Sequence, residues 1–222
     1  MTRQSAPLPD PLLPERPTDA RVQVDSAEWL FGPDWPGLRL LARRDRDGLH
    51  LTDATGTAVD DLTEATRLLD RAVAPDLAVL DGVWTAHPFW GADDSSAANG
   101  AGDEAGGEAA HAFVALDLLE LEGEPLLDVP FQERHRLLRS VVRESVGVRV
   151  SPVVKQPITG WLGGWREQGF THYLARHQNA PYRPGVRSDD WFRIPIVAEQ
   201  PGGGFIGRLT GVRSRRPRRI GD

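Results

Sequence analysis

The stretch GFTHYLARHQNAPYRPGVRSDDWFRI, residues 169–194, is the part of the chain that decides its fold. Apolar residues cluster at its two ends and predict strands near residues 169–176 and 191–197. Pro184 and Gly185 lie between them and mark a turn. Two strands joined by a turn-rich connection indicate an antiparallel sheet in this half of the chain.

The preceding sequence supplies more strands and two helices. Strands are predicted at residues 37–44 and 48–53, joined by a turn at Asp47-Gly48, and at 77–86, 112–121 and near 146–154. A helix is predicted at 60–74, capped by Asp60 or Asp61, with an apolar face made of Leu62, Ala65, Leu68, Leu69 and Ala72. A second is predicted at 128–144, with Pro130 in its first turn and Asp128 or Val129 at the cap. This order indicates an α+β fold of mostly antiparallel sheets with packed helices.

Three segments differ in composition from this core. Residues 1–24 are rich in proline and polar residues, and we expect them to run extended over the surface. Residues 91–109 are almost entirely small or acidic, which predicts a disordered loop inside the domain of residues 25–198. Residues 199–222 are expected to form a flexible basic tail that begins with a linker at Gly202-Gly203-Gly204.

Composition excludes several classes of protein. The chain has no cysteine, and its net charge of -6 argues against a protein that is basic all over. No signal peptide or apolar run long enough to span a bilayer is visible, so we expect a cytoplasmic protein. The one lysine is Lys155, and every other cationic side chain is an arginine, which cannot act as a nucleophilic amine.

Four stretches in a fixed order resemble the ATP-dependent DNA ligases, particularly the ligase domain of the bacterial end-joining enzyme. WLFGPDWPGLR at 29–39 is similar to the family's W-L-F-E-x-K-W-D-G-Y-R, and AVLDGVWTA at 78–86 is similar to V-L-D-G-E-L-V-A. FVALDLLELEG from Phe113 resembles F-D-L-L-x-L-x-G, and APYRPGVRSDDW at 180–191 is a long ungapped match. The resemblance spans residues 11–196 and implies a nucleotidyltransferase (adenylation) fold. Only 26 residues follow Ile196, so the family's OB-fold domain is not expected.

The resemblance also implies that the catalytic residues are replaced. Nucleotidyl transfer needs an amine nucleophile, carboxylates for a metal ion and cations for the phosphates. Asp34 stands at the lysine nucleophile, and Val83 and Thr171 stand at two metal-associated glutamates. Gly32 replaces another family glutamate, and Pro36 replaces the aspartate of K-x-D-G. Arg176 and Arg193 replace lysines and should keep positive charge where phosphates would lie. The remnant of the nucleotide pocket is therefore expected at Trp35, Gly37, Arg39, Leu116, Arg176 and Arg193. We expect a cavity to persist between residues 34–39, 78–86 and 169–176, with no metal site.

Other residues have alternative interpretations. Lys155 lies far from the first motif, so we expect an ordinary solvated lysine and not a substitute nucleophile. None of the six histidines has the spacing of a zinc-binding motif. Asp117, Arg134, Tyr182, Gly185 and Trp191 match family positions that maintain turns, ion pairs and packing. Trp161 and Trp165 in GWLGGW indicate either core residues or an exposed turn that stacks on a partner.

Non-specific contact with DNA is expected from arginines. Arg183 and Arg187 lie in the matching Y-R-P-G-x-R-S segment, which in the family faces the backbone of nicked DNA. Five more arginines form a compact cluster in the tail: Arg213, Arg215, Arg216, Arg218 and Arg219. The alternative for the tail is an ordinary solvated terminus.

Three functions remain open at this point. The first is a catalytically inactive ligase-like protein that acts as an accessory or DNA-binding module in DNA repair, with DNA or a repair protein as its partner. The second is an active or altered ATP-dependent ligase that uses ATP and magnesium. The third is a non-catalytic nucleotide-binding sensor.

Overall fold

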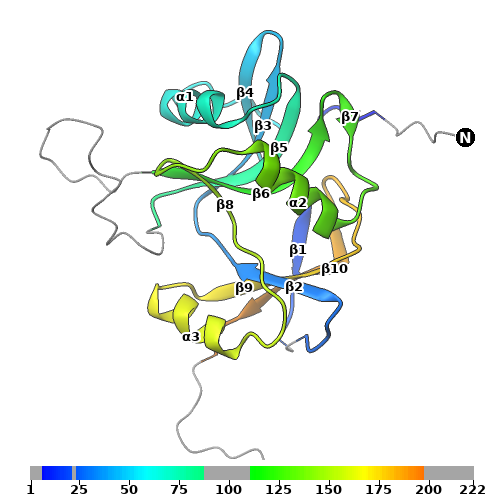
Figure 1. Ribbon diagram of the computed structural model, residues 1–222, viewed down its shortest axis with the longest axis vertical. Helices are drawn as coiled ribbons and strands as arrows, with labels where there is room; N and C mark the ends of the chain where they lie inside the picture. The colour runs from blue at the N-terminus through cyan, green and yellow to red at the C-terminus, as the bar shows by residue number, and fades with distance from the viewer. Residues whose placement is uncertain (1–6, 22–23, 88–110, 198–222) are drawn as a thin grey trace, which may run out of the picture.

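Two β-sheets carry the fold, and the helices pack against them (Figure 1). The structure is a computed structural model that describes residues 7–21, 24–87 and 111–197. The larger sheet contains β4 (Gly48–Asp53), β3 (Leu38–Asp45), β5 (Ala78–Thr85), β6 (Ala112–Leu121) and β7 (Glu124–Pro125), with β8 (Val148–Val150) paired to β6. The smaller sheet contains β1 (Arg16–Asp19), β10 (Arg187–Pro195), β9 (His172–His177) and β2 (Trp29–Pro33) in that order. Most of these pairs are antiparallel, which confirms the α+β prediction.

Helices α1 (Thr63–Ala72) and α2 (Phe131–Val141) cover one face of the larger sheet. The apolar side chains alternate along β3, so Leu40 and Ala42 face the helices and are fully buried. Leu69 of α1 and Leu138 of α2 meet them in the same core, also fully buried. The apolar face predicted for α1 is confirmed.

The smaller sheet has its own core and its own helix. Phe31 of β2 and Tyr173 of β9 pack against α3 (Thr159–Glu167), whose Trp165 is fully buried. The sequence predicted no helix here, because three glycines in nine residues lower helix propensity. Trp165 is thus a core residue, whereas Trp161 on the same helix is 45% exposed.

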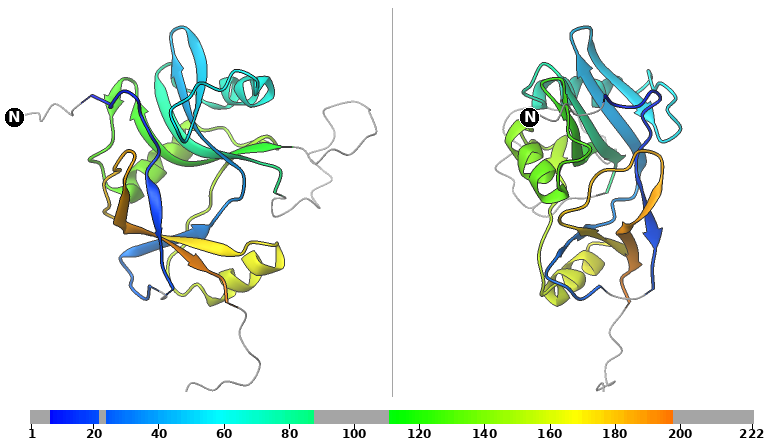
Figure 2. Two further views of the ribbon diagram at one scale, coloured as in Figure 1. Left: turned by 180° about the vertical axis from the view of Figure 1, so that it is seen from behind. Right: turned by 90° about the vertical axis from the view of Figure 1, so that its right-hand side faces the viewer.

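The N-terminal segment is extended, but it is more than a surface strand. β1 pairs in parallel with β10, and Figure 2 shows the segment running from the larger sheet down to the smaller one. Leu12 is buried against the larger sheet, and Glu15 is 1% exposed. The proline-rich composition predicted the extended conformation but not this burial, which depends on partners far along the chain.

Both helices begin later than predicted. Leu62 is the N-cap residue of α1, and no side chain caps this helix. The prediction that Asp60 or Asp61 caps it is therefore wrong. Pro130 precedes α2 instead of lying in its first turn, and neither Asp128 nor Val129 is the cap. The free N–H groups of Phe131 and Gln132 donate to the carbonyls of Ala180 and Gln178, so the loop before β10 replaces a capping side chain.

Two predicted segments lie outside the described residues. They are the loop at residues 91–109 and the basic tail at 199–222, with its glycine linker and its five arginines. No helix in the described part of the chain is long and apolar enough to cross a membrane.

Candidate functional site

The first motif forms strand β2, a tight turn and the start of β3. Gly37 has a φ of 146°, and a Cβ atom at this position would lie 2.3 Å from the carbonyl oxygen of Trp84. Only glycine allows the turn to approach β5 this closely. The turn therefore keeps its place against the larger sheet, with Asp34 between β2 and the turn.

Asp34 is bound to Arg193 of β10. The Nε atom of Arg193 donates to Oδ2 of Asp34 at 2.7 Å, and a second nitrogen of Arg193 contacts Nδ1 of His172 at 3.1 Å. Asp19 lies 3.7 Å from the same guanidinium group. The side chains of Asp34 and Arg193 are 25% and 36% exposed, so this ion pair lies at the edge of the interior. Asp34, at the position of the family's nucleophile, is thus neutralised by Arg193, which stands where the family has a lysine.

Arg176 of β9 is enclosed by carboxylates and aromatic rings. Its guanidinium group donates to Asp117 and to Glu15, each at 2.6 Å. It also lies over the rings of Phe131 and Trp191, at 4.5 and 4.6 Å from their centroids. Arg176 is 4% exposed. Arg176 keeps its positive charge, as expected, but two buried carboxylates neutralise it.

Arg39 is held in the same way from the opposite sheet. Its guanidinium group binds both carboxylate oxygens of the fully buried Asp81, one of them at 2.6 Å. The hydroxyl of Tyr182 donates to Asp81 at 2.7 Å, and Arg39 also lies 5.2 Å from the ring of Trp191. Burial works against the charged guanidinium, but the Asp81 carboxylate outweighs it and raises the pKa of Arg39.

These contacts are parts of one buried charge network. We use this name for Arg39, Arg134, Arg176, Asp81, Asp117 and Glu15, three cations and three carboxylates. Arg134 of α2 binds Asp117 at 2.8 Å through two nitrogens, and both side chains are fully buried. Tyr182 connects the two halves, since its hydroxyl donates to Asp81 and accepts the N–H of Glu15. The network links the two sheets and has no net charge to offer a nucleotide.

The carboxylates of the network respond differently to burial. Burial raises the pKa of Glu15, and Arg176 and the Ser188 hydroxyl oppose the increase only in part. Burial alone would also raise the pKa of Asp117, but the charges of Arg134 and Arg176 outweigh burial, so the pKa of Asp117 is lowered. Asp117 therefore remains ionised between two arginines.

The cavity that remains beside this network is too small for a nucleotide. It has a volume of about 30 Å³, and Gly32, Leu116, Ser151, Arg176 and Trp191 are among the residues that line it. Ligand sites usually measure about 300 Å³ or more, whereas a single water needs roughly 10–15 Å³. This cavity has room for a water molecule or two, and its lining includes Leu174 and Arg176 of β9 but no residue of 34–39 or 78–86.

Two substituted positions, Gly32 and Val83, and the retained Trp35 lie in tightly packed surroundings. A Cβ atom at Gly32 would lie 2.7 Å from the carbonyl oxygen of Pro152, so the chain after β8 occupies the place of a glutamate side chain. Val83 is 4% exposed and packs with Trp35 and Leu116 in the core of the smaller sheet. Trp35 is fixed there, since its Nε1 donates to the Ser151 hydroxyl at 2.9 Å.

The remaining sequence-predicted residues do not assemble into a metal site. Thr171 is exposed, and its hydroxyl lies 2.9 Å from Nδ1 of His172. Within the described ranges, no group of three or more histidine, aspartate or glutamate residues could hold a metal ion. Glu15 is the site residue that sequence reasoning missed, because nothing near it in the sequence indicates a partner 161 positions away.

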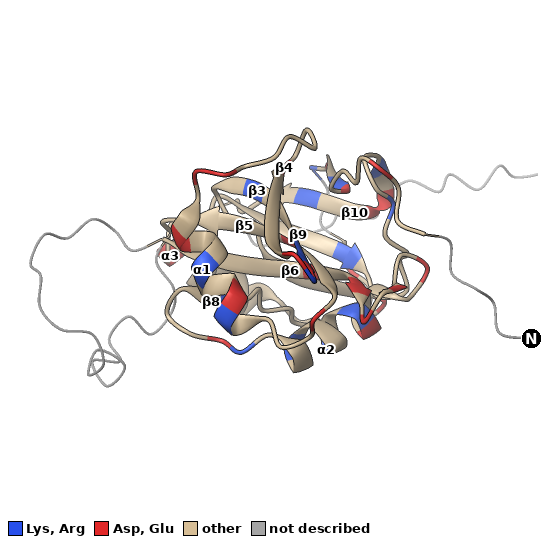
Figure 3. Cartoon of the chain, turned by 90° about the horizontal axis from the view of Figure 1, so that it is seen from above, with Lys and Arg blue, Asp and Glu red and all other residues tan. Residues whose placement is uncertain are grey.

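The arginines proposed for DNA contact have carboxylate neighbours. Arg183 lies 3.1 Å from Asp190, and Arg187 lies 3.5 Å from Asp19. Both arginine side chains are about half exposed, at 49% and 54%. Figure 3 shows basic and acidic residues interspersed over the described part of the chain in this view. Arg183 and Arg187 thus remain accessible, but in a mixed electrostatic environment.

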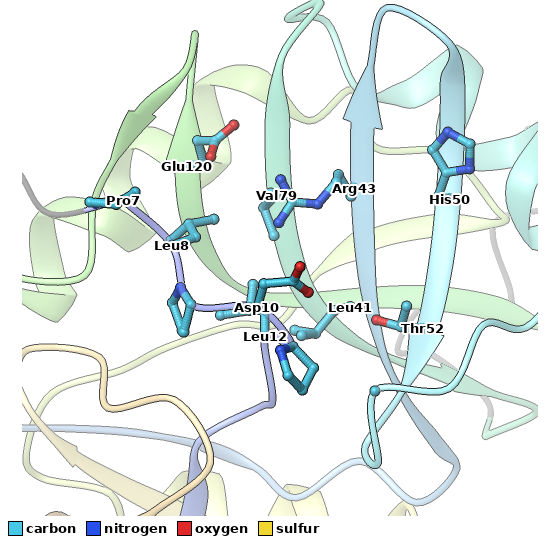
Figure 4. Close-up of a pocket in the computed structure, with 13 residues that line it drawn as sticks. Pro7, Leu8, Asp10, Leu12, Leu41, Arg43, His50, Thr52, Val79 and Glu120 are labelled. Atoms are coloured by element: carbon cyan, nitrogen blue, oxygen red, sulfur yellow. The ribbon is translucent and has the colours of Figure 1, made fainter.

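A larger hollow lies away from these residues, on the other face of the larger sheet (Figure 4). It has a volume of about 520 Å³, and Leu41 and Val79 form its floor beside the segment of residues 7–12. Arg43 and Glu120 flank Val79 from the neighbouring strands. Its charges are mixed, and none of the residues predicted for the nucleotide site lines it.

Comparison with known proteins finds similar proteins over most of the chain. No protein-family model matches the chain. Over 189 residues the chain is 29% identical to the multifunctional non-homologous end joining protein LigD of Mycobacterium bovis, an alignment that covers 83% of this chain and 24% of that protein. It is 26% identical over 212 residues to a probable DNA ligase of Streptomyces griseus, covering 82% of this chain and 40% of that one.

Solved structures agree with this relationship. Mycobacterial DNA ligase D complexed with ATP and MES superposes with a TM-score of 0.65 at 24% identity, covering 84% of this chain and 60% of that chain. The ligase domain of LigD from M. tuberculosis gives a TM-score of 0.62 at 23% identity, covering 83% of this chain and 59% of that chain.

The chain is therefore similar to ATP-dependent DNA ligases over most of its length, and its fold is that of their adenylation domain. It spans about a quarter to two fifths of the length of the two curated relatives, and about three fifths of the two solved chains.

Proposed function

We propose that this relative of the ATP-dependent DNA ligases is not a nucleotidyltransferase but a cytoplasmic accessory or DNA-binding module of DNA repair. The observation that carries the proposal is the pairing of Asp34 with Arg193 at 2.7 Å. A nucleotidyl transfer needs an amine at the first position and a free cation at the second. Here the first position is the Asp34 carboxylate, and the cation at the second, Arg193, is already paired with it.

The surroundings of this pair support the same conclusion. ATP and magnesium do not fit the residues present, because Arg176 is bound by two carboxylates and Val83 lies in an apolar core. A triphosphate would have to displace Glu15 and Asp117 from Arg176 and would approach Asp34 as a like charge. We therefore expect ATP to bind no better than roughly millimolar, near -4 kcal/mol.

Self-adenylation is the direct test. The full chain is incubated with radiolabelled ATP and magnesium and separated on a denaturing gel, with an active ATP-dependent ligase as the positive control. We expect no labelled band from the chain. A band that withstands alkali, is released by acid as expected of a lysine phosphoramidate, and disappears in a Lys155→Arg variant would show an active enzyme and would overturn the proposal.

Asp34→Lys tests whether the nucleophile alone is missing. We expect this variant to remain unlabelled, because the carboxylates that hold a metal are still absent and Arg176 is still neutralised. Titration calorimetry with ATP separates the sensor hypothesis from the proposal. Micromolar binding without labelling would favour a nucleotide sensor.

A further inference from the structure

Helix α3 borders a groove that takes no part in the network described above. The groove has a volume of about 290 Å³ and lies between α3, the end of β10 and the chain before β2. Its lining is Val24, Asp25, Gln156, Ile158, Thr159, Leu162, Gly163, Arg166, Ile196 and Val197. Six of these ten residues are aliphatic or glycine, and the two charged ones carry opposite signs.

The surface around the groove is unusual for one that faces only water. Val197 is 74% exposed, and Trp161 on α3 is 45% exposed. A Cβ atom added at Gly160, Gly163 or Gly164 would meet nothing within 4 Å. Each glycine inside a helix costs about 0.5–1 kcal/mol relative to alanine, and the described residues give no packing reason for any of the three. Glycine at Gly163 lets another chain approach the helix backbone from the groove.

The sequence that follows Val197 supplies an occupant. Val197 itself lines the groove, and residues 198–222 continue directly from it. Three consecutive glycines at 202–204 allow the chain to reverse. Phe205, Ile206, Leu209 and Val212 come next, and this spacing places apolar side chains on one side of a helical or turn-rich segment.

We propose that residues 205–212 of the same chain dock in this groove. The seven residues 198–204 can span at most about 23 Å at roughly 3.3 Å each, which confines the segment to the neighbourhood of Val197. A short flexible linker gives an effective concentration in the millimolar range, so even weak apolar contacts suffice. The opposite charges of Asp25 and Arg166, which both line the groove, offset each other, so we expect apolar contacts to select the segment.

Docking would also fix the place of the arginine cluster. Residues 213–219 follow the docked segment at once, so they would leave the groove beside the smaller sheet instead of ranging over the whole surface. This consequence does not depend on the proposed function, since the groove contains none of the residues assigned to nucleotide chemistry.

Paramagnetic relaxation in the full chain tests the proposal. The chain has no cysteine, so a single Thr210→Cys substitution accepts a nitroxide label at one place. A Phe205→Asp/Ile206→Asp variant with the same label gives the broadening expected of an undocked segment. We expect the native segment to broaden the amide signals of α3 and of Val24 and Asp25 well beyond that baseline.

Two glycine variants provide a matched comparison on the same helix. Gly163→Leu places a side chain into the groove, and Gly160→Leu places one on α3 outside its lining. Both have open space, so both should fold. Gly163→Leu should reduce the broadening of α3 to the undocked baseline, and Gly160→Leu should leave it unchanged.

Three results would overturn the proposal. The native segment could give no more broadening than the Phe205→Asp/Ile206→Asp chain. Gly160→Leu and Gly163→Leu could have the same effect. Broadening could also pass from a labelled chain to an isotope-labelled, nitroxide-free chain in a mixture, which would identify a second copy as the occupant.

Discussion

Arg176 stands where the family has a lysine, but here it is bound by two buried carboxylates. Its neighbours are Glu15 and Asp117, both almost completely buried, and the three groups are linked by hydrogen bonds of 2.6 Å. Buried ion pairs of this kind contribute little net stability, but removing one partner leaves a buried charge without compensation. Arg176 is thus a structural residue whose loss would be felt in folding.

Arg176→Met should lower the free energy of unfolding by about 3–5 kcal/mol, because Glu15 loses its guanidinium partner and Asp117 loses one of two. Urea unfolding followed by circular dichroism measures the change. Arg183→Met is the matched control, since its pair with Asp190 is half exposed and should be worth at most about 1 kcal/mol. Equal losses in the two variants would show that the buried charge network does not stabilise the fold.

His135 of α2 should make stability depend on pH. Burial lowers its pKa, although its Nε2 lies 3.0 Å from the carbonyl of Ser151 and Asp117 favours the charged form. The unfolded chain takes up this proton near pH 6.5, and the folded chain only at lower pH. Between these values the unfolded state binds more protons, so stability falls as the pH falls, by at most about 1.4 kcal/mol per unit.

His135→Gln should reduce this slope below pH 6.5 while keeping a donor for the Ser151 carbonyl. Unfolding free energies of both proteins between about pH 5 and 8.5 give the comparison. Above about pH 7.5 the two curves should run parallel, since the histidine is neutral in both states. Burial also lowers the pKa of His87, so some slope should remain in the variant. An unchanged slope would contradict the assignment to His135.

At the scale of elements, four strands of the larger sheet were predictable, whereas strand β2 and the details of the helices were not. β3, β4, β5 and β6 begin and end within one or two residues of the predicted bounds, because alternation and apolar runs are local signals. The start of α2 was not predictable, since its first N–H groups bind carbonyls of residues 178 and 180. α3 was missed for a different reason, because its glycines obscure a helix that Trp165 anchors in the core.

In the candidate site, too, the sequence identified the positions of the residues but not their partners. Matching residues to the ligase pattern singled out Asp34, Arg39, Arg176 and Arg193. The structure pairs Asp34 with Arg193 and places Arg39 and Arg176 over the same Trp191 ring. The pairing of Arg39 and Arg176 with carboxylates could not be read from the sequence. It depends on Glu15, Asp81 and Asp117, which approach through strand register and burial.

Glycines in two elements should respond oppositely to alanine. Gly160→Ala on α3 meets open space and should stabilise the protein by up to about 1 kcal/mol through helix propensity. Gly82→Ala on β5 would place its Cβ 2.3 Å from the ring of Phe113 and 2.6 Å from the Val114 carbonyl, so it should destabilise the protein by about 1–3 kcal/mol. Thermal unfolding of the two variants is the measurement. A loss of stability in Gly160→Ala would mean that something contacts this face of α3.

At the scale of the whole molecule, an acidic chain carries its densest positive charge near one end. The net charge is -6, and five arginines lie within residues 213–219. In the described part of the chain, the arginines of the buried charge network are neutralised, and Arg183, Arg187 and Arg193 each have an acidic neighbour. Any attraction for a phosphate backbone should therefore depend mainly on the tail.

DNA binding, if the proposed function holds, should be non-specific and steeply dependent on salt. Neutralising about four phosphates should give a slope near -3.6 when log affinity is plotted against log salt. Fluorescence anisotropy with nicked and blunt duplexes between about 50 and 200 mM salt measures this slope, since counterion release dominates in that range. Replacing the five tail arginines by glutamine should remove most of the binding and flatten the slope, whereas Arg183→Gln/Arg187→Gln should have a smaller effect because both arginines already face carboxylates. If the native chain fails to bind either duplex at the lowest salt, the DNA-binding role is excluded, and a protein of the repair machinery becomes the partner to seek.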